Sequence, residues 1–190
     1  MLREWELIVH RAIGSPARKS TDLEKCRSIE IGYSTTAAKA FGESLAPQLE
    51  GFRSFRFVYL SGMFAEREKD KKLWFLADSR NIKVEAARHG SGELLLTCPQ
   101  GEAEVGILEI QKQCSNFRVS IVRPGGVLGK GSLVPNFLMG RLLHIKLEEL
   151  AAAMIDEAII DEPVGNVEAT RTLENDSLRA RGRRALAKAN

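Results

Sequence analysis

The segment that decides the fold reads Phe55-Arg-Phe-Val-Tyr-Leu-Ser-Gly62. Bulky and β-branched side chains alternate over the length of a strand, and Ser61-Gly62 ends the strand as a turn. A second segment of the same kind comes later in the chain, Val119-Ser-Ile-Val-Arg-Pro-Gly-Gly126. Helical patterns separate these strands. Strands that alternate with helices are typical of a parallel α/β sheet with a ligand crevice at its strand ends.

Around these two segments, we expect one further strand, which precedes Phe55 in the chain, and five helices. The strand is residues 7–13, an apolar run that ends at Gly14-Ser15-Pro16. The helices are predicted where apolar residues recur at three- and four-residue steps, at residues 21–45, 73–83, 101–111, 147–160 and 176–189. In the fourth helix this spacing predicts a buried stripe of Leu147, Leu150, Ala151, Met154, Ile155, Ala158 and Ile159. The predicted fold class is α/β, a partial Rossmann-like parallel sheet with flanking helices.

The composition is that of an ordinary globular protein, with 44% hydrophobic and 28% charged residues in a chain of 190. The net charge of +3 is too small to imply nucleic acid or an anionic membrane as a partner. Neither the 3 cysteines nor the 3 histidines have metal-ligand spacing, so we expect no metal. Unpaired thiols indicate a cytoplasmic protein. The sequence has no secretory signal and no apolar run of the roughly 18 residues that would suggest a membrane span.

One segment, Val84–Gln100, interrupts an otherwise continuous helical pattern. It contains Gly90-Ser-Gly92 and Cys98-Pro99, which do not continue a helix, and the pattern resumes at Gly101. The interruption conflicts with the local consistency expected of a folding sequence. One hypothesis is a retained intron, because valine codons begin with GT and a glutamine codon can end in AG. The alternative is a genuine surface-loop insertion, which loops tolerate at small cost.

Three segments together carry a resemblance to a known family. They are the strand ending Tyr59-Leu-Ser61-Gly62, the following helix with Lys83, and the strand ending Val122-Arg-Pro-Gly125. Over residues 7–160 the chain resembles the short-chain dehydrogenase/reductase superfamily, and more narrowly its atypical branch related to nucleoside-diphosphate-sugar epimerases. The resemblance implies an NAD- or NADP-binding, epimerase- or reductase-like protein with a small-molecule substrate. It implies a partial NAD(P)-binding domain at residues 1–172 and a C-terminal helix at 173–190.

The resemblance also implies roles for individual residues. Ser61 would position a substrate oxygen, and Lys83 would bind the nicotinamide ribose beside a catalytic tyrosine. The tyrosine position, four residues before the lysine, is Ser79 in this chain. A serine hydroxyl is far too weak an acid to replace a phenol, whose ordinary pKa is ~10. The cofactor-binding residues that the resemblance implies are Gly14, Ser15, Ser61, Lys83, Arg123, Pro124 and Gly125.

A second departure concerns the cofactor phosphates. The family's first βαβ unit has a Gly-rich turn that binds the pyrophosphate at a helix N-terminus, and no such GxGxxG pattern occurs near Met1. We therefore expect the N-terminal βαβ unit to be missing and the activity to be impaired or absent. The alternative interpretation is a non-catalytic truncated fragment or pseudoenzyme that binds no cofactor.

Each of these positions also has a purely structural interpretation. Ser61 would then be a turn residue at a strand end, Lys83 a solvated helix lysine, and Arg123–Gly125 a rigid turn. The basic C-terminal helix has several arginines but no interleaved aromatic residues. This favours a solvated helix face over a nucleic-acid-binding surface.

Overall fold

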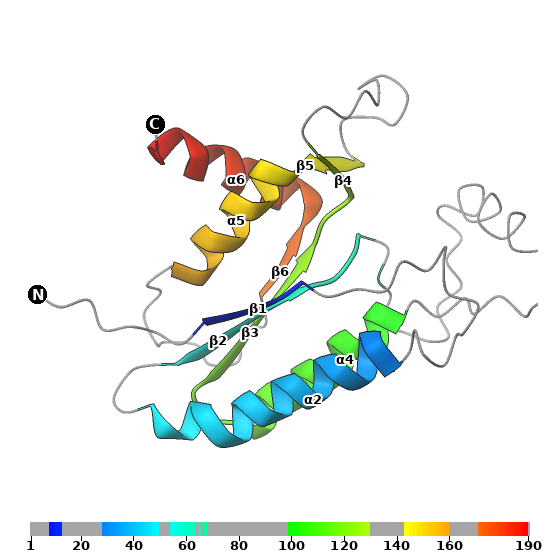
Figure 1. The fold of residues 1–190 in the computed structure, drawn as a ribbon, viewed down its shortest axis with the longest axis vertical. Helices are drawn as coiled ribbons and strands as arrows, with labels where there is room; N and C mark the ends of the chain where they lie inside the picture. Colours follow the sequence, from blue (N-terminus) through cyan, green and yellow to red (C-terminus); the bar gives the residue numbers. More distant parts are fainter. Residues whose placement is uncertain are drawn as a thin grey trace, which may run out of the picture.

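The computed structural model describes residues 8–12, 28–49, 54–63, 65, 67, 99–129, 143–159 and 171–189. Its centre is a sheet of four strands in the order β1-β2-β3-β6, in which every neighbouring pair is parallel (Figure 1). The strands are β1 (Ile8–Arg11), β2 (Phe55–Leu60), β3 (Phe117–Arg123) and β6 (Arg171–Glu174). The predicted α/β class, with a parallel sheet between helices, is confirmed.

Two shorter strands form a separate parallel pair. β4 (Gly126–Leu128) follows β3 after two residues, and β5 (His144–Lys146) leads directly into the next helix. In register, Gly126 lies opposite His144 and Leu128 opposite Lys146. This small sheet was not predicted, because strands of three residues are too short to give an alternating pattern.

Two helical runs cover one face of the main sheet. The first joins η1 (Ser28–Gly32), α2 (Tyr33–Ala40), η2 (Phe41–Leu45) and η3 (Ala46–Gln48), and the second is α4 (Pro99–Gln113). The first run continues through Gly32, which has helical backbone angles. It ends at Gln48, three residues beyond the predicted end at residue 45. Of the predicted insertion 84–100, only Pro99 and Gln100 are described, and both belong to α4. Proline is well suited to the first position of a helix, where its missing N–H has no helical partner.

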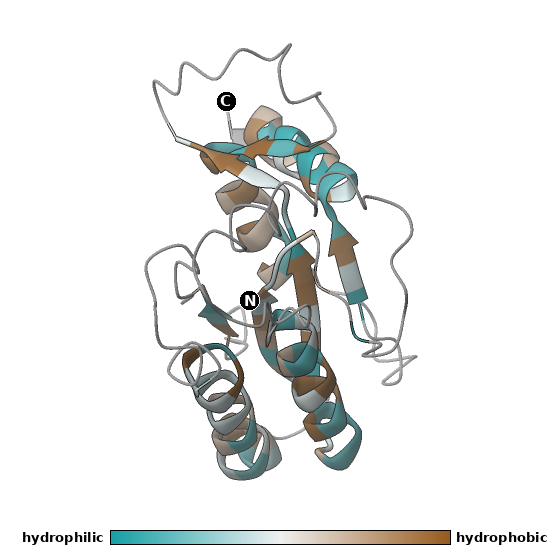
Figure 2. Ribbon diagram, turned by 90° about the vertical axis from the view of Figure 1, so that its right-hand side faces the viewer, coloured by the Kyte–Doolittle hydropathy of each residue, from teal (hydrophilic) through white to brown (hydrophobic). Residues whose placement is uncertain are grey.

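Two further helices, α5 (Leu147–Ile159) and α6 (Asn175–Ala189), cover the opposite face (Figure 1). The core therefore has two parts, one on each side of the sheet. The first is rich in phenylalanine, and the second is mainly aliphatic. Figure 2 shows hydrophobic residues along the strands, between helices whose turns alternate between hydrophobic and hydrophilic residues. This is the pattern of a sheet buried on both faces.

The predicted buried stripe of α5 is wrong at four of its seven positions. Leu150, Met154 and Ala158 are buried as expected, but the remaining members are exposed, namely Leu147, Ala151, Ile155 and Ile159. Their place on the inner side is taken by residues that include Glu149 and Glu157. The reason is α6, which lies against α5 and offers arginines that pair with these carboxylates.

The expectation of a solvated basic face on α6 is wrong for Arg181. Its side chain is 9% exposed, and it forms ion pairs with Asp156 at 2.8 Å and with Glu157 at 2.7 Å. Arg183 is half exposed and pairs with Glu149 at 2.9 Å. Part of the basic character of α6 is therefore neutralised by the acids of α5. In the described part of the chain, no helix has the length and apolar character needed to cross a membrane.

Candidate functional site at the carboxyl end of the sheet

Polar side chains gather where β2, β3 and β6 end. Ser61 follows β2 directly, and its N–H donates to the carbonyl oxygen of Val122, so it lies next to Arg123. Arg123 is in register with Glu174 of β6. Because side chains alternate along a strand, Ser61 and Arg123 point to the same face as Tyr59 and Ile121, the face covered by α4.

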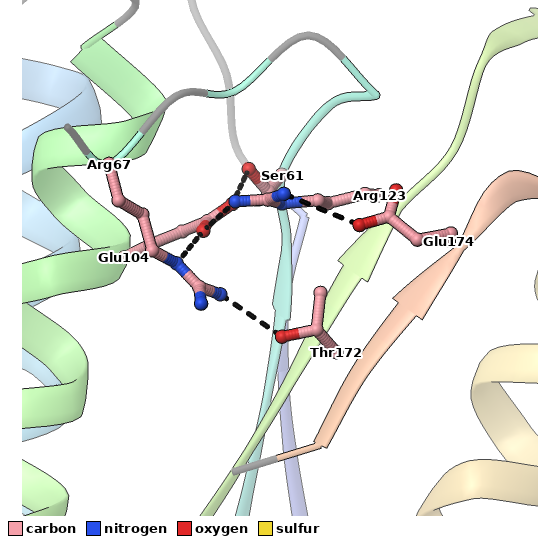
Figure 3. Close-up of polar contacts among 6 residues, drawn as sticks. All are labelled: Ser61, Arg67, Glu104, Arg123, Thr172 and Glu174. Atoms are coloured by element: carbon pink, nitrogen blue, oxygen red, sulfur yellow. Dashed lines mark hydrogen bonds and ion pairs between the residues drawn. The ribbon is translucent and has the colours of Figure 1, made fainter. Parts of the chain in front are cut away.

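Glu104 of α4 connects these strands. Its side chain is fully buried, and its two carboxyl oxygens accept four hydrogen bonds (Figure 3). Oε1 accepts from the Ser61 hydroxyl at 2.6 Å and from Nε of Arg123 at 2.9 Å. Oε2 accepts from Nε of Arg67 and from Nη2 of Arg123, both at 2.6 Å. A buried carboxyl group is tolerated only with such complete pairing.

The two arginines extend the network to β6. Nη2 of Arg67 donates to the Thr172 hydroxyl at 3.0 Å, and Nη1 of Arg123 donates to Glu174 at 3.3 Å. The hydrogen bonds to Glu104 are the main cause that raises the pKa of Arg123 above its ordinary value. Arg123 is therefore a permanent cation, and the two guanidinium groups are balanced by two carboxyl groups. We call these six residues the Glu104 cluster: Ser61, Arg67, Glu104, Arg123, Thr172 and Glu174.

A second buried polar group lies on the same face, nearer β1. Arg11 donates to the Ile29 carbonyl oxygen at 2.9 Å and pairs with Glu30 at 3.5 Å. Its guanidinium carbon lies 5.3 Å from the centre of the Tyr59 ring. Burial is the main cause that raises the pKa of Tyr59, and the charges of Glu30 and Glu104 add to it, whereas Arg11 opposes it. Tyr59 is therefore a poor proton donor.

The Arg123-Pro-Gly turn is held tightly by its surroundings. The N–H of Gly125 donates to Oδ1 of Asn175, the first residue of α6, at 2.8 Å. A side chain at Gly125 would place its Cβ 2.3 Å from the carbonyl oxygen of Leu143. The Pro124 carbonyl accepts from the N–H of Met63 at 2.9 Å. These contacts fix the turn beside the Glu104 cluster and explain why a glycine is needed there.

The structure brings together part of the predicted site. Ser61 and Arg123 meet at Glu104, and Pro124 and Gly125 follow directly. The other predicted residues, namely Gly14, Ser15, Ser79 and Lys83, lie outside the described residues.

Sequence reasoning missed Glu104 and Arg67. A signal for Glu104 was present, because it stands with Ile107, Leu108 and Gln111 at the spacing of one helix face. Arg67 belongs to a dense mixed-charge run that resembles an ordinary solvated surface, so nothing in the sequence set it apart.

No group of three or more histidine, cysteine or acidic side chains that could hold a metal ion occurs among the described residues. Comparison with known proteins adds no assignment, because neither a protein-family model nor a curated protein matches the chain.

Proposed function

We propose that this protein binds NAD or NADP at the carboxyl ends of β2 and β3. It would be a relative of the atypical short-chain dehydrogenases/reductases, epimerase- or reductase-like in its fold. The observation that carries the proposal is the convergence of Ser61, Arg123 and Gly125 at one end of a parallel sheet. Ligands of open parallel α/β sheets bind outside the carboxyl ends of the strands.

We propose further that the protein binds the dinucleotide without transferring hydride. In the resemblance, Ser61 would donate a hydrogen bond to a substrate oxygen, but its hydroxyl donates to Glu104 at 2.6 Å. The tyrosine position is Ser79, and Tyr59 is buried with a raised pKa. A small-molecule substrate would therefore meet neither a free hydroxyl donor at Ser61 nor a phenolic acid at these positions.

The second candidate is a non-catalytic protein that binds no cofactor. The specific observation in its favour is that the Glu104 cluster is satisfied internally. Arg123 uses Nε, Nη1 and Nη2 on protein carboxyl groups, and Ser61 uses its proton on Glu104. Under this second candidate, the cluster has a structural role alone and holds α4, β3 and β6 together.

Titration of the 190-residue chain with NADPH and with NADH, followed by nicotinamide fluorescence, tests the proposal. We expect micromolar binding of at least one of them and no oxidation of the bound dinucleotide by simple aldehydes or ketones. Gly125→Ala should weaken binding at least about tenfold, because its Cβ displaces the turn. Gly129→Ala is the matched control, because no atom lies within 4 Å of its Cβ position. Absence of binding by both dinucleotides would leave the second candidate.

A further inference from the structure

Arg67 lies close to the carboxyl end of the sheet, the end at which open parallel α/β sheets bind their ligands. It follows β2 by seven residues, yet its guanidinium reaches past β3 to Thr172 on β6, which is in register with Ile121. Figure 3 shows the side chain lying between α4 and β6, with Glu104 on one side and Thr172 on the other. The space beside β3 and β6, two residues before their carboxyl ends, is thus filled by a side chain of the protein itself.

Of the two arginines, Arg67 is the one whose side chain can move away from Glu104. Arg123 is 15% exposed and makes three hydrogen bonds to Glu104 and Glu174. Its removal would deprive the buried Glu104 carboxyl group of two of its four hydrogen bonds. Arg67 is 32% exposed and makes one bond to Glu104 and one to Thr172. If it swings outward, water solvates its charge, and Glu104 keeps Arg123 and Ser61 as partners.

We infer that the Arg67 side chain fills the ligand site in the free protein. A bound ligand displaces this side chain and replaces its hydrogen bonds with those of hydroxyl or amide groups. The chemistry follows from what Arg67 leaves behind. Oε2 of Glu104 would lose one of its two donors and keep only Nη2 of Arg123, and the Thr172 hydroxyl would lose the donor that Arg67 supplies. A phosphate beside Glu104 would be repelled, whereas a ribose diol or a carboxamide supplies N–H or O–H donors. Nicotinamide dinucleotides carry both groups, and in this respect the inference rests on the proposed function.

Removal of the Arg67 side chain should therefore strengthen the binding of NADPH. We expect Arg67→Ala to bind NADPH about tenfold more tightly than the wild type, since the ligand no longer competes with a charge-assisted hydrogen bond. Arg67→Met keeps much of the aliphatic part of the side chain and removes both hydrogen bonds of the guanidinium, so an increase of about threefold is expected. Lys112→Ala is the charge-matched control, because it removes one cation from an exposed ion pair with Glu109. Its affinity should equal that of the wild type.

The outcomes separate the inference from the proposed function. Tighter binding by Arg67→Ala supports the inference even if the wild type binds too weakly to measure. If the wild type binds NADPH and Arg67→Ala binds equally or more weakly, the inference is overturned and the proposed function stands. If no variant binds, both are overturned. Arg67→Met decides the question if Arg67→Ala is unfolded, as judged by circular dichroism and thermal melting. Inorganic phosphate should compete with NADPH no better than chloride at equal ionic strength.

Discussion

Glu104→Ala is expected to lower the free energy of unfolding by about 3–5 kcal/mol, because it leaves Arg123 without its main partner in a buried site. The Glu104 side chain has no exposed surface, and the Arg123 side chain is only 15% exposed. The substitution removes all four hydrogen bonds to the carboxyl group at once. Among them are the bonds that join α4 to β3 and to the end of β2. Urea denaturation followed by circular dichroism measures the effect.

Glu109→Ala provides the matched control on the same helix. Glu109 pairs with Lys112 at 2.8 Å, but both side chains are more than half exposed. The expected loss is below about 0.5 kcal/mol, because solvent screens such pairs. Glu104→Gln should fall between the two, since the amide keeps the shape and loses the charge. Equal losses for Glu104→Ala and Glu109→Ala would contradict a central role for the Glu104 cluster.

Three of the four strands of the main sheet could be predicted, because the pattern that identifies each of them is local, whereas β6 was not predicted. In β2, Phe55, Phe57 and Tyr59 face the side covered by α4, and this alternation is visible in the sequence itself. The parallel arrangement followed from the helical patterns between strands. The class of fold was therefore accessible without knowledge of any contact between distant residues.

The Glu104 cluster could be predicted only in part because its contacts are not local. Ser61 and Arg123 stood out as strand-end residues, whereas the hydrogen bond from Arg67 to Thr172 spans 105 positions. The error on α5 has the same origin. Its apolar periodicity suggested that Ile155 and Ile159 face inward, but the ion pairs with α6 decide which face is buried, and a sequence pattern does not contain them.

Gly182→Ala is expected to lower the free energy of unfolding by about 3 kcal/mol, because α5 and α6 touch at this residue through their backbones. A Cβ at Gly182 would lie 2.0 Å from the carbonyl oxygen of Glu149 and 2.8 Å from its Cα. Backbone atoms cannot rotate away, so the helices must separate. Separation would also strain the ion pairs that Arg181 and Arg183 make with α5.

The matched control for Gly182→Ala is Gly32→Ala, a second glycine within a helical run. Its Cβ would lie 3.7 Å from Oγ of Ser28, an ordinary contact, and its backbone angles suit alanine. This change should stabilise the protein by about 0.4–1 kcal/mol through the unfolded chain. Thermal melting should therefore move in opposite directions for the two variants, by about 2–4 °C per kcal/mol in a chain of this size. An unchanged melting temperature for Gly182→Ala would contradict the close approach of α5 and α6, because no side-chain rearrangement can accommodate a methyl group against the backbone of Glu149.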